Sequence, residues 1–199
     1  MMADGTDGNI ITYNASGAPA AVATGSSGQL LTSAGAGSPP TFTTVTSGYT
    51  LGTDTATSSG SAITFGSIPS GVSNLRLLFE DASASGGSQP MFLIQLGDAG
   101  GIETSGYVST ALNNNGDAGN STTGFLVQMG GAGNTMAGIY DFQLKDSSNN
   151  TFVGTLQLKS TATTTADGAG YKSLSGELTQ IKITPQTAFD NGSINIAYF

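Results

Sequence analysis

Paired carboxylates are the side chains of this sequence that could perform catalysis. The 199 residues include no His and no Cys, so Ser–His and Cys–His nucleophile systems are excluded. Two carboxylates can hydrolyse a glycosidic bond. One candidate pair is Glu80 with Asp81 at the end of an expected strand, and the other is Asp98 with Glu103 around a Gly-rich loop. Acids at turns are usually solvated, and no Trp is present to line a sugar-binding groove. We therefore expect no catalytic residues and predict that the protein is not an enzyme.

Two polar loops contain oxygen atoms of the kind that Ca²⁺ prefers as ligands. They are residues 113–120, NNNGDAGN, and residues 146–150, DSSNN. Neither matches an EF-hand or a Gly-Asp repeat, and Asx turns account for the same residues. The Gly-rich strings GAGSPP and GGAGN lack the Lys and the following helix of a phosphate loop. The sequence therefore predicts no cofactor and no metal site, and it leaves open whether the loops bind calcium or glycan.

The charge balance limits the partners. Thirteen acids and five bases give a net charge of −8, and the bases are scattered along the chain at Arg76, Lys145, Lys159, Lys172 and Lys182. Nucleic acids and anionic membranes are bound mainly by clustered Lys and Arg. No apolar run approaches the length of a membrane span, and MMADGTDGN lacks the basic and apolar parts of a signal peptide. We expect no nucleic-acid partner and no membrane insertion.

The elements that must position these residues are short strands. The chain contains 30 Gly, 24 Ser and 27 Thr, and Thr favours strands whereas Gly and Ser mark turns. No long window of helix-forming residues is free of Gly. From residue 49 onward the strand candidates are 63–65, 75–79, 91–96, 107–112, 125–129, 139–144, 152–158, 181–184 and 194–199.

Turn clusters separate these candidates. ADGAG at residues 166–170 is one such cluster, and Asn191-Gly192 predicts a tight turn that sets the register of the last strand. Alternation places Tyr140, Phe142 and Leu144 on one face of their strand. We therefore predict an all-β protein whose residues 49–199 form an antiparallel, jelly-roll-like β-sandwich.

The first 48 residues contain a 20-residue self-match. Residues 5–24, GTDGNIITYNASGAPAAVAT, and residues 25–44, GSSGQLLTSAGAGSPPTFTT, are identical at six positions. Each unit predicts a turn, a short apolar strand, a Gly- and Pro-containing turn and a second extended piece. At the same offset Ile10 and Ile11 meet Leu30 and Leu31, and Val22 meets Phe42.

One such unit cannot bury its own apolar face, so the missing neighbours are expected from other copies in a symmetric oligomer. A flexible Gly/Ser linker is the alternative interpretation. We expect residues 1–48 to be an extended N-terminal arm for attachment and oligomerisation. Its expected contact residues are Ile10, Ile11, Tyr13, Leu30, Leu31 and Phe42.

The strings GNIITYNASGAP and GSSGQLLTSAGAGSPPTF resemble a segment found in tail fibres and other surface proteins of tailed bacteriophages. That segment reads Gly-Gln, two apolar residues, Thr, small residues, Gly, Pro and an aromatic residue. The resemblance covers about residues 5–46. The runs ITFGSIPSGVSNLRL and ITPQTAFDNGSINIAYF are also similar to the C-terminal β-sandwich domains of phage fibre and decoration proteins.

This resemblance implies a structural virion protein, assembled in the host cytoplasm and displayed on the virion surface. The expected form is a homotrimeric capsid decoration protein, of the cement or head-fibre type, that binds the major capsid protein through its arm. The alternative is a short tail fibre that attaches to a tail component and binds a glycan or protein receptor on the host surface. A secreted carbohydrate-binding module is a third possibility, against which the missing Trp and signal peptide argue.

Overall fold

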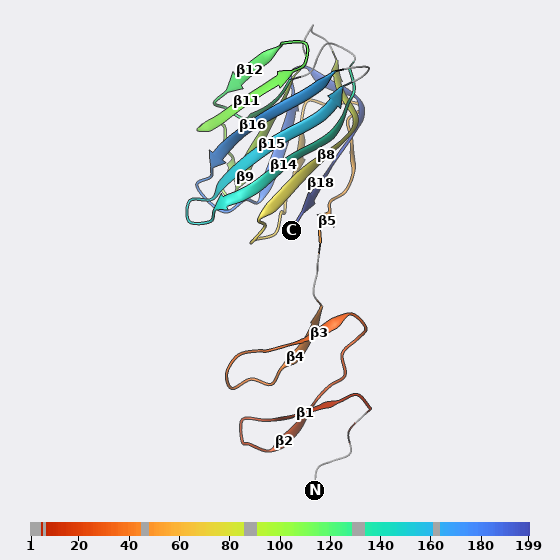
Figure 1. Cartoon of the computed structure of the whole chain (residues 1–199), viewed down its shortest axis with the longest axis vertical. Helices are drawn as coiled ribbons and strands as arrows, with labels where there is room; N and C mark the ends of the chain where they lie inside the picture. The colour runs from red at the N-terminus through yellow and green to blue at the C-terminus, as the bar shows by residue number, and fades with distance from the viewer. Residues whose placement is uncertain (1–4, 6, 45–47, 86–90, 129–133, 161–163) are drawn as a thin grey trace. The chain divides into compact units, whose positions relative to one another are not determined.

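The protein is described by a computed structural model that covers residues 5, 7–44, 48–85, 91–128, 134–160 and 164–199. Within these ranges every regular element is a β-strand, which confirms the all-β prediction. The chain divides into two compact units, Met1–Gly48 and Tyr49–Phe199 (Figure 1). We call them unit 1 and unit 2.

Unit 1 consists of two β-hairpins that follow one another along the chain (Figure 1). Hairpin 1 pairs β1 with β2 and hairpin 2 pairs β3 with β4, both antiparallel. The strands are β1 (Ile10–Tyr13), β2 (Pro19–Val22), β3 (Gln29–Thr32) and β4 (Thr41–Thr44).

Unit 2 contains two antiparallel sheets among its described residues. The larger sheet has nine strands in the order β12-β11-β16-β15-β14-β8-β18-β5, and β6 also pairs with β18. Its strands are β5 (Thr50–Leu51), β6 (Thr55–Ala56), β8 (Asn74–Ser85), β11 (Tyr107–Asn113), β12 (Ala118–Ser121), β14 (Met136–Asp146), β15 (Thr151–Ser160), β16 (Thr165–Ser173) and β18 (Ala188–Tyr198).

The smaller sheet has five strands in the order β10-β9-β17-β7, and β13 also pairs with β9. These strands are β7 (Ile63–Phe65), β9 (Met91–Asp98), β10 (Gly101–Ile102), β13 (Phe125–Gln128) and β17 (Gln180–Pro185). Most of the strand candidates expected from the sequence are present, several of them longer than expected. The end of the 125–129 candidate, Met129, lies outside the described residues.

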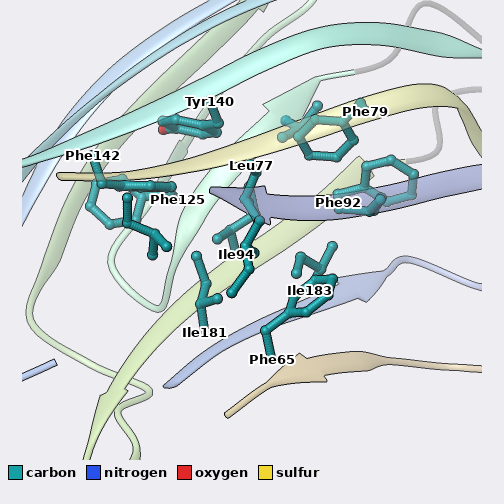
Figure 2. Packing of buried hydrophobic residues seen from close by; sticks show 14 of the residues in the cluster. Phe65, Leu77, Phe79, Phe92, Ile94, Phe125, Tyr140, Phe142, Ile181 and Ile183 are labelled. Carbon is teal, nitrogen blue, oxygen red and sulfur yellow. The ribbon is translucent and has the colours of Figure 1, made fainter. Parts of the chain in front are cut away.

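Unit 2 has one apolar core, to which both sheets contribute. Side chains alternate between the two faces of a strand, so Tyr140 and Phe142 of β14 point inward, as the alternation predicted, with Leu144 packed against the same core. The ring of Phe125, from β13 in the smaller sheet, packs edge-on against Phe142 at a centroid distance of 5.0 Å (Figure 2). Phe79 of β8 also contacts the other sheet, but its ring stacks nearly parallel on that of Phe92 of β9, at a centroid distance of 6.1 Å.

Three glycines on the inner faces of β15 and β16 allow close packing, two of them against these rings and the third against the backbone of β11. A Cβ atom on Gly154 would lie 2.9 Å from the ring of Phe142, and one on Gly170 would overlap the carbonyl oxygen of Val108 and reach the ring of Phe125. A Cβ on Gly168 would lie 3.0 Å from the carbonyl oxygen of Thr110. Residues 166–170 are therefore part of β16, and the prediction of a turn there is wrong.

The Asn191-Gly192 pair lies inside β18 and does not precede it. The register of β18 on β8 shifts on both sides of Asn191, which marks a bulge. Gly192 has φ +84°, and a side chain there would overlap the backbone of Asp81. The predicted tight turn is thus wrong, and the pair forms a bulge. A tight turn and a bulge can both require a glycine with positive φ, so the sequence Asn-Gly does not distinguish them.

The first residues of unit 2 are bound along its last strand. Thr50 and Leu51 pair with Tyr198 and Ala197, and the chain stays beside β18 as far as Thr57, whose N–H donates to the Gly192 carbonyl oxygen at 2.7 Å. We call residues 50–57 the strap. At its start the ring of Tyr49 packs edge-on against Phe199 at 4.9 Å and lies under the Arg76 guanidinium at 5.0 Å.

Candidate functional site: the two N-terminal hairpins

The two hairpins of unit 1 repeat the same backbone conformations 20 residues apart. Gly8 and Gly28 both have φ +84° before their first strands, and Gly17 and Gly37 have φ +77° and +80° in the loops. These values fall in the left-handed region that favours glycine. Two of the three glycine pairs shared by the sequence units therefore take the same left-handed conformation at equivalent positions.

Local hydrogen bonds hold the turns. In hairpin 1 the Asn14 side-chain oxygen accepts hydrogen bonds from the N–H groups of Ser16 and Ala18, both at 3.0 Å. In hairpin 2 the Gln29 side-chain oxygen accepts one from the Ser26 N–H at 2.8 Å. These are turn-stabilising contacts of Asn and Gln with nearby backbone, and they leave the apolar strand residues as the features to be explained.

The register determines which apolar residues share a face. In hairpin 1 Ile10 lies opposite Val22, and in hairpin 2 Leu31 lies opposite Phe42. Val22 and Phe42 occupy equivalent repeat positions, but the repeat equivalent of Ile10 is Leu30 and not Leu31. The strand pairing of hairpin 2 is therefore shifted by one residue relative to that of hairpin 1. A one-residue shift exchanges the two faces of a strand. We call the face with Val22 or Phe42 the covered face and the opposite one the open face.

Exposure agrees with this division. On the covered faces Val22 is 9% exposed, Ile10 38% and Leu31 44%, and the ring of Phe42 packs on Gly25. On the open faces Ile11, Leu30 and Tyr13 are 58%, 58% and 67% exposed. The structure thus places all six predicted contact residues in the paired strands β1, β3 and β4, five of them exposed. A two-stranded hairpin is at best marginally stable alone, and these side chains have no core to enter.

The hairpins carry almost no charge. No residue from 8 to 53 is charged, whereas six of the eight net negative charges belong to residues 54–199. An uncharged apolar surface can meet another such surface without desolvating ions. The chemistry that this site offers is therefore association by apolar contact and by the unpaired backbone groups of the strand edges.

The acidic residues considered for catalysis lie in unit 2, where hydrogen bonds fix them. Glu103 forms an ion pair with Lys172, whose side chain is only 7% exposed and lies 5.4 Å from the centre of the Tyr107 ring. The Ser175 hydroxyl lies 2.7 Å from an Asp98 oxygen and 2.9 Å from a Glu103 oxygen. Sequence reasoning missed Lys172 and Ser175, since only the strand pairing brings them to these acids.

Hydrogen bonding lowers the pKa of both carboxylates. The Ser175 hydroxyl and the Gly100 N–H hold the pKa of Asp98 below its usual value. Burial acts to raise the pKa of Glu103, but hydrogen bonds from Lys172 and Ser175 outweigh it and the pKa is lowered. A general acid needs a raised pKa at neutral pH, which neither carboxylate has. Their hydrogen bonds and the ion pair join the β9–β10 region to Lys172 of β16 and to Ser175.

Glu80 and Asp81 do not lie at a strand end, as the sequence suggested, but inside β8. Asp81 has φ +48° opposite the bulge at Gly192, and its carboxylate accepts a hydrogen bond from Thr135 at 3.2 Å. The acids thus mark an irregularity in strand pairing.

The two polar loops form Asx turns. The Asn113 side-chain oxygen accepts hydrogen bonds from the N–H groups of Asn115 and Asp117, both at 3.1 Å. Asp146 likewise accepts from the Ser148 N–H at 2.9 Å. Within the residues that the structure describes, no three acidic side chains are grouped to hold a metal ion.

Comparison of the chain with protein-family models, curated proteins and solved structures found no match. In the part of the chain that is described, no helix has the length and apolar character needed to cross a membrane.

Proposed function

We propose that the chain is a non-enzymatic structural protein of a tailed-bacteriophage particle, a homotrimeric capsid decoration protein of the cement or head-fibre type. Its hairpins form an arm that attaches to the major capsid protein, and residues 49–199 are displayed on the virion surface after assembly in the host cytoplasm. The observation that supports this proposal is the contrast between the units. Unit 2 has a complete core, whereas the hairpins expose uncharged apolar side chains on both faces.

The finer fold assignment belongs to the same proposal. The two sheets of unit 2 share a core in the manner of a β-sandwich, and the matching glycine conformations support a true tandem repeat in residues 5–24 and 25–44. The jelly-roll-like connectivity stays a prediction. So does the absence of nucleic-acid binding, which the net charge of −8 supports.

A short tail fibre is the second candidate, and a groove in unit 2 favours it. The groove has a volume of about 390 Å³, and its lining includes the apolar Leu93, Leu126 and Pro185 and the polar Asn120 and Gln186. Apolar contact combined with amide hydrogen bonds suits a glycan or protein receptor. In this alternative the arm attaches to a tail component.

Counting copies on purified particles distinguishes the two candidates. Quantitative mass spectrometry would give the ratio of this chain to the major capsid protein and to the tail proteins. For a decoration protein, we expect the number of copies of this chain per copy of the major capsid protein to be a simple fraction, because the repeating shell lattice offers a fixed number of binding sites. A number comparable to that of the tail proteins would favour the fibre, and complete absence from particles would contradict both.

Deletion of residues 1–46 tests the role of the arm. We expect the shortened protein, which retains Tyr49 and the whole core of unit 2, to fold and yet fail to bind particles that lack the native protein. Co-sedimentation with such particles measures binding, with the full chain as the positive control. Undiminished binding of the shortened protein would refute attachment through the arm.

A further inference from the structure

Each hairpin needs cover on both of its faces. The open faces expose Ile11, Tyr13 and Leu30, and the covered faces still leave Ile10 and Leu31 more than a third exposed. A hairpin is a single layer without a core, and stable folds bury an apolar face against another layer. The way in which copies can cover both faces is limited by symmetry.

A two-fold dimer uses the same patch on both partners, so it would cover one face of each hairpin and leave the other in water. A closed ring uses two different patches, because each copy contacts one neighbour with one face and the next neighbour with the other. We propose that the hairpins of three or more copies associate in such a ring, with the open face of one copy against the covered face of the next. This inference rests on the proposed function, in which the arm joins copies of the chain.

The charge distribution selects a second copy as the occupant of these faces. Copies that each carry a net charge of −8 repel one another, and the repulsion is weakest where the surface is uncharged. No residue from 8 to 53 is charged, and this stretch of the sequence includes both hairpins. Apolar faces of like composition then meet without any buried charge, and the strand edges remain available to the particle.

Charged substitutions on the two faces test the ring in the full-length chain. Ile10→Lys places a charge on the covered face and Ile11→Glu places one on the open face. Sedimentation velocity over a concentration series and native mass spectrometry would give the number of copies and the concentration at half-assembly. We expect three or more copies for the unchanged chain. Each single variant should raise the half-assembly concentration at least about tenfold, because it buries an unpaired charge.

The double variant Ile10→Lys/Ile11→Glu identifies the contact. In the ring a Lys on one copy meets the Glu of the next, so assembly should recover most of what either single variant lost. In a two-fold contact Lys would meet Lys or Glu would meet Glu, and the double variant would stay dissociated. Ala34→Lys and Ala34→Glu are matched controls, since residue 34 is exposed in the loop between β3 and β4 and should leave assembly unchanged.

A monomeric or dimeric chain, single variants that assemble normally, or a double variant that does not recover would each overturn the ring. Particle binding is measured separately on the same proteins. A monomer that still binds particles would refute the ring and the homotrimeric state but spare the proposed attachment to the particle. A ring that does not bind particles would spare the ring and refute the proposed attachment.

Discussion

Lys172 shows how a charged residue is tolerated inside unit 2. Its ammonium group is paired with Glu103 and lies over the face of the Tyr107 ring, and its side chain is almost completely buried. Burial of a charge is costly unless the charge is paired and hydrogen-bonded. The intact pair therefore adds little to the free energy of unfolding, but removal of one partner should lower that free energy strongly.

A double-mutant cycle measures this dependence. Glu103→Ala leaves the Lys172 charge buried without its partner and should destabilise the protein by about 3–5 kcal/mol. Glu103→Ala/Lys172→Met removes both charges and should be clearly more stable than Glu103→Ala. Urea unfolding of the unchanged chain, of Glu103→Ala, of Lys172→Met and of the double variant gives the four free energies of the cycle. Equal stability of Glu103→Ala and the double variant would show that the pair is not coupled.

The same cluster makes stability depend on pH. The pKa values of Asp98 and Glu103 are lowered in the folded protein, so their contribution is complete above the unfolded values of about 4 and is lost as the pH falls through the folded values. Ser175→Ala removes hydrogen bonds to both carboxylates. We expect it to destabilise the protein more at pH 7 than at pH 2, because the loss shrinks as the pH falls and the acids take up protons. Thermal unfolding at the two pH values would check this, and an equal loss at both would contradict it.

At the scale of elements, β16 explains why part of the fold could not be read from the sequence. Long candidates such as residues 139–144 were predicted correctly, because alternating large residues define an inward face. In β16 the inward positions include Gly168 and Gly170, which the sequence presents as a turn. Their role depends on Phe125 and on the backbone of β11, which are distant in the chain. The short strands that carry Ile10, Leu30 and Phe42 were predicted, and the role of these residues as contacts stays a prediction. The one-residue shift of hairpin 2 depends on loop length and was not predicted.

Substitution of these glycines tests that explanation. Gly170→Ala should destabilise unit 2 by at least about 1–3 kcal/mol, the range for overpacked cores, because the new methyl group would overlap a backbone oxygen of β11. Gly168→Ala should cost less, since its nearest contact is 3.0 Å away. Ala169→Ser, on the exposed face of the same strand, is the control and should be nearly neutral. Denaturant unfolding ranks the three variants by their loss of unfolding free energy. A Gly170→Ala variant as stable as the unchanged chain would contradict the packing argument.

At the scale of the whole molecule, the two units differ in what holds them together. The core cluster of buried residues begins at Ile63 and ends at Ile196, so it lies entirely in unit 2. We therefore expect deletion of residues 1–46 to leave the free energy of unfolding of unit 2 within about 0.5 kcal/mol of the full chain, the range for changes outside the core. Urea unfolding followed by Tyr fluorescence measures it. A large loss would show that the hairpins stabilise unit 2.

The strap gives the molecule a mechanical property. Residues 50–57 run antiparallel to β18 from Tyr198 to Gly192, so the chain that joins the units enters at one end of unit 2 and is bonded along that edge. When the hairpins are held and the opposite end of unit 2 is pulled, the load acts along the strand and shears these hydrogen bonds together, instead of opening them one by one. The rings of Tyr49 and Phe199 share the load at its point of entry. Single-molecule pulling should therefore give a high rupture force that falls in Tyr49→Ala but not in Tyr49→Phe. If the arm attaches as proposed, these hydrogen bonds would carry the load between unit 2 and the particle.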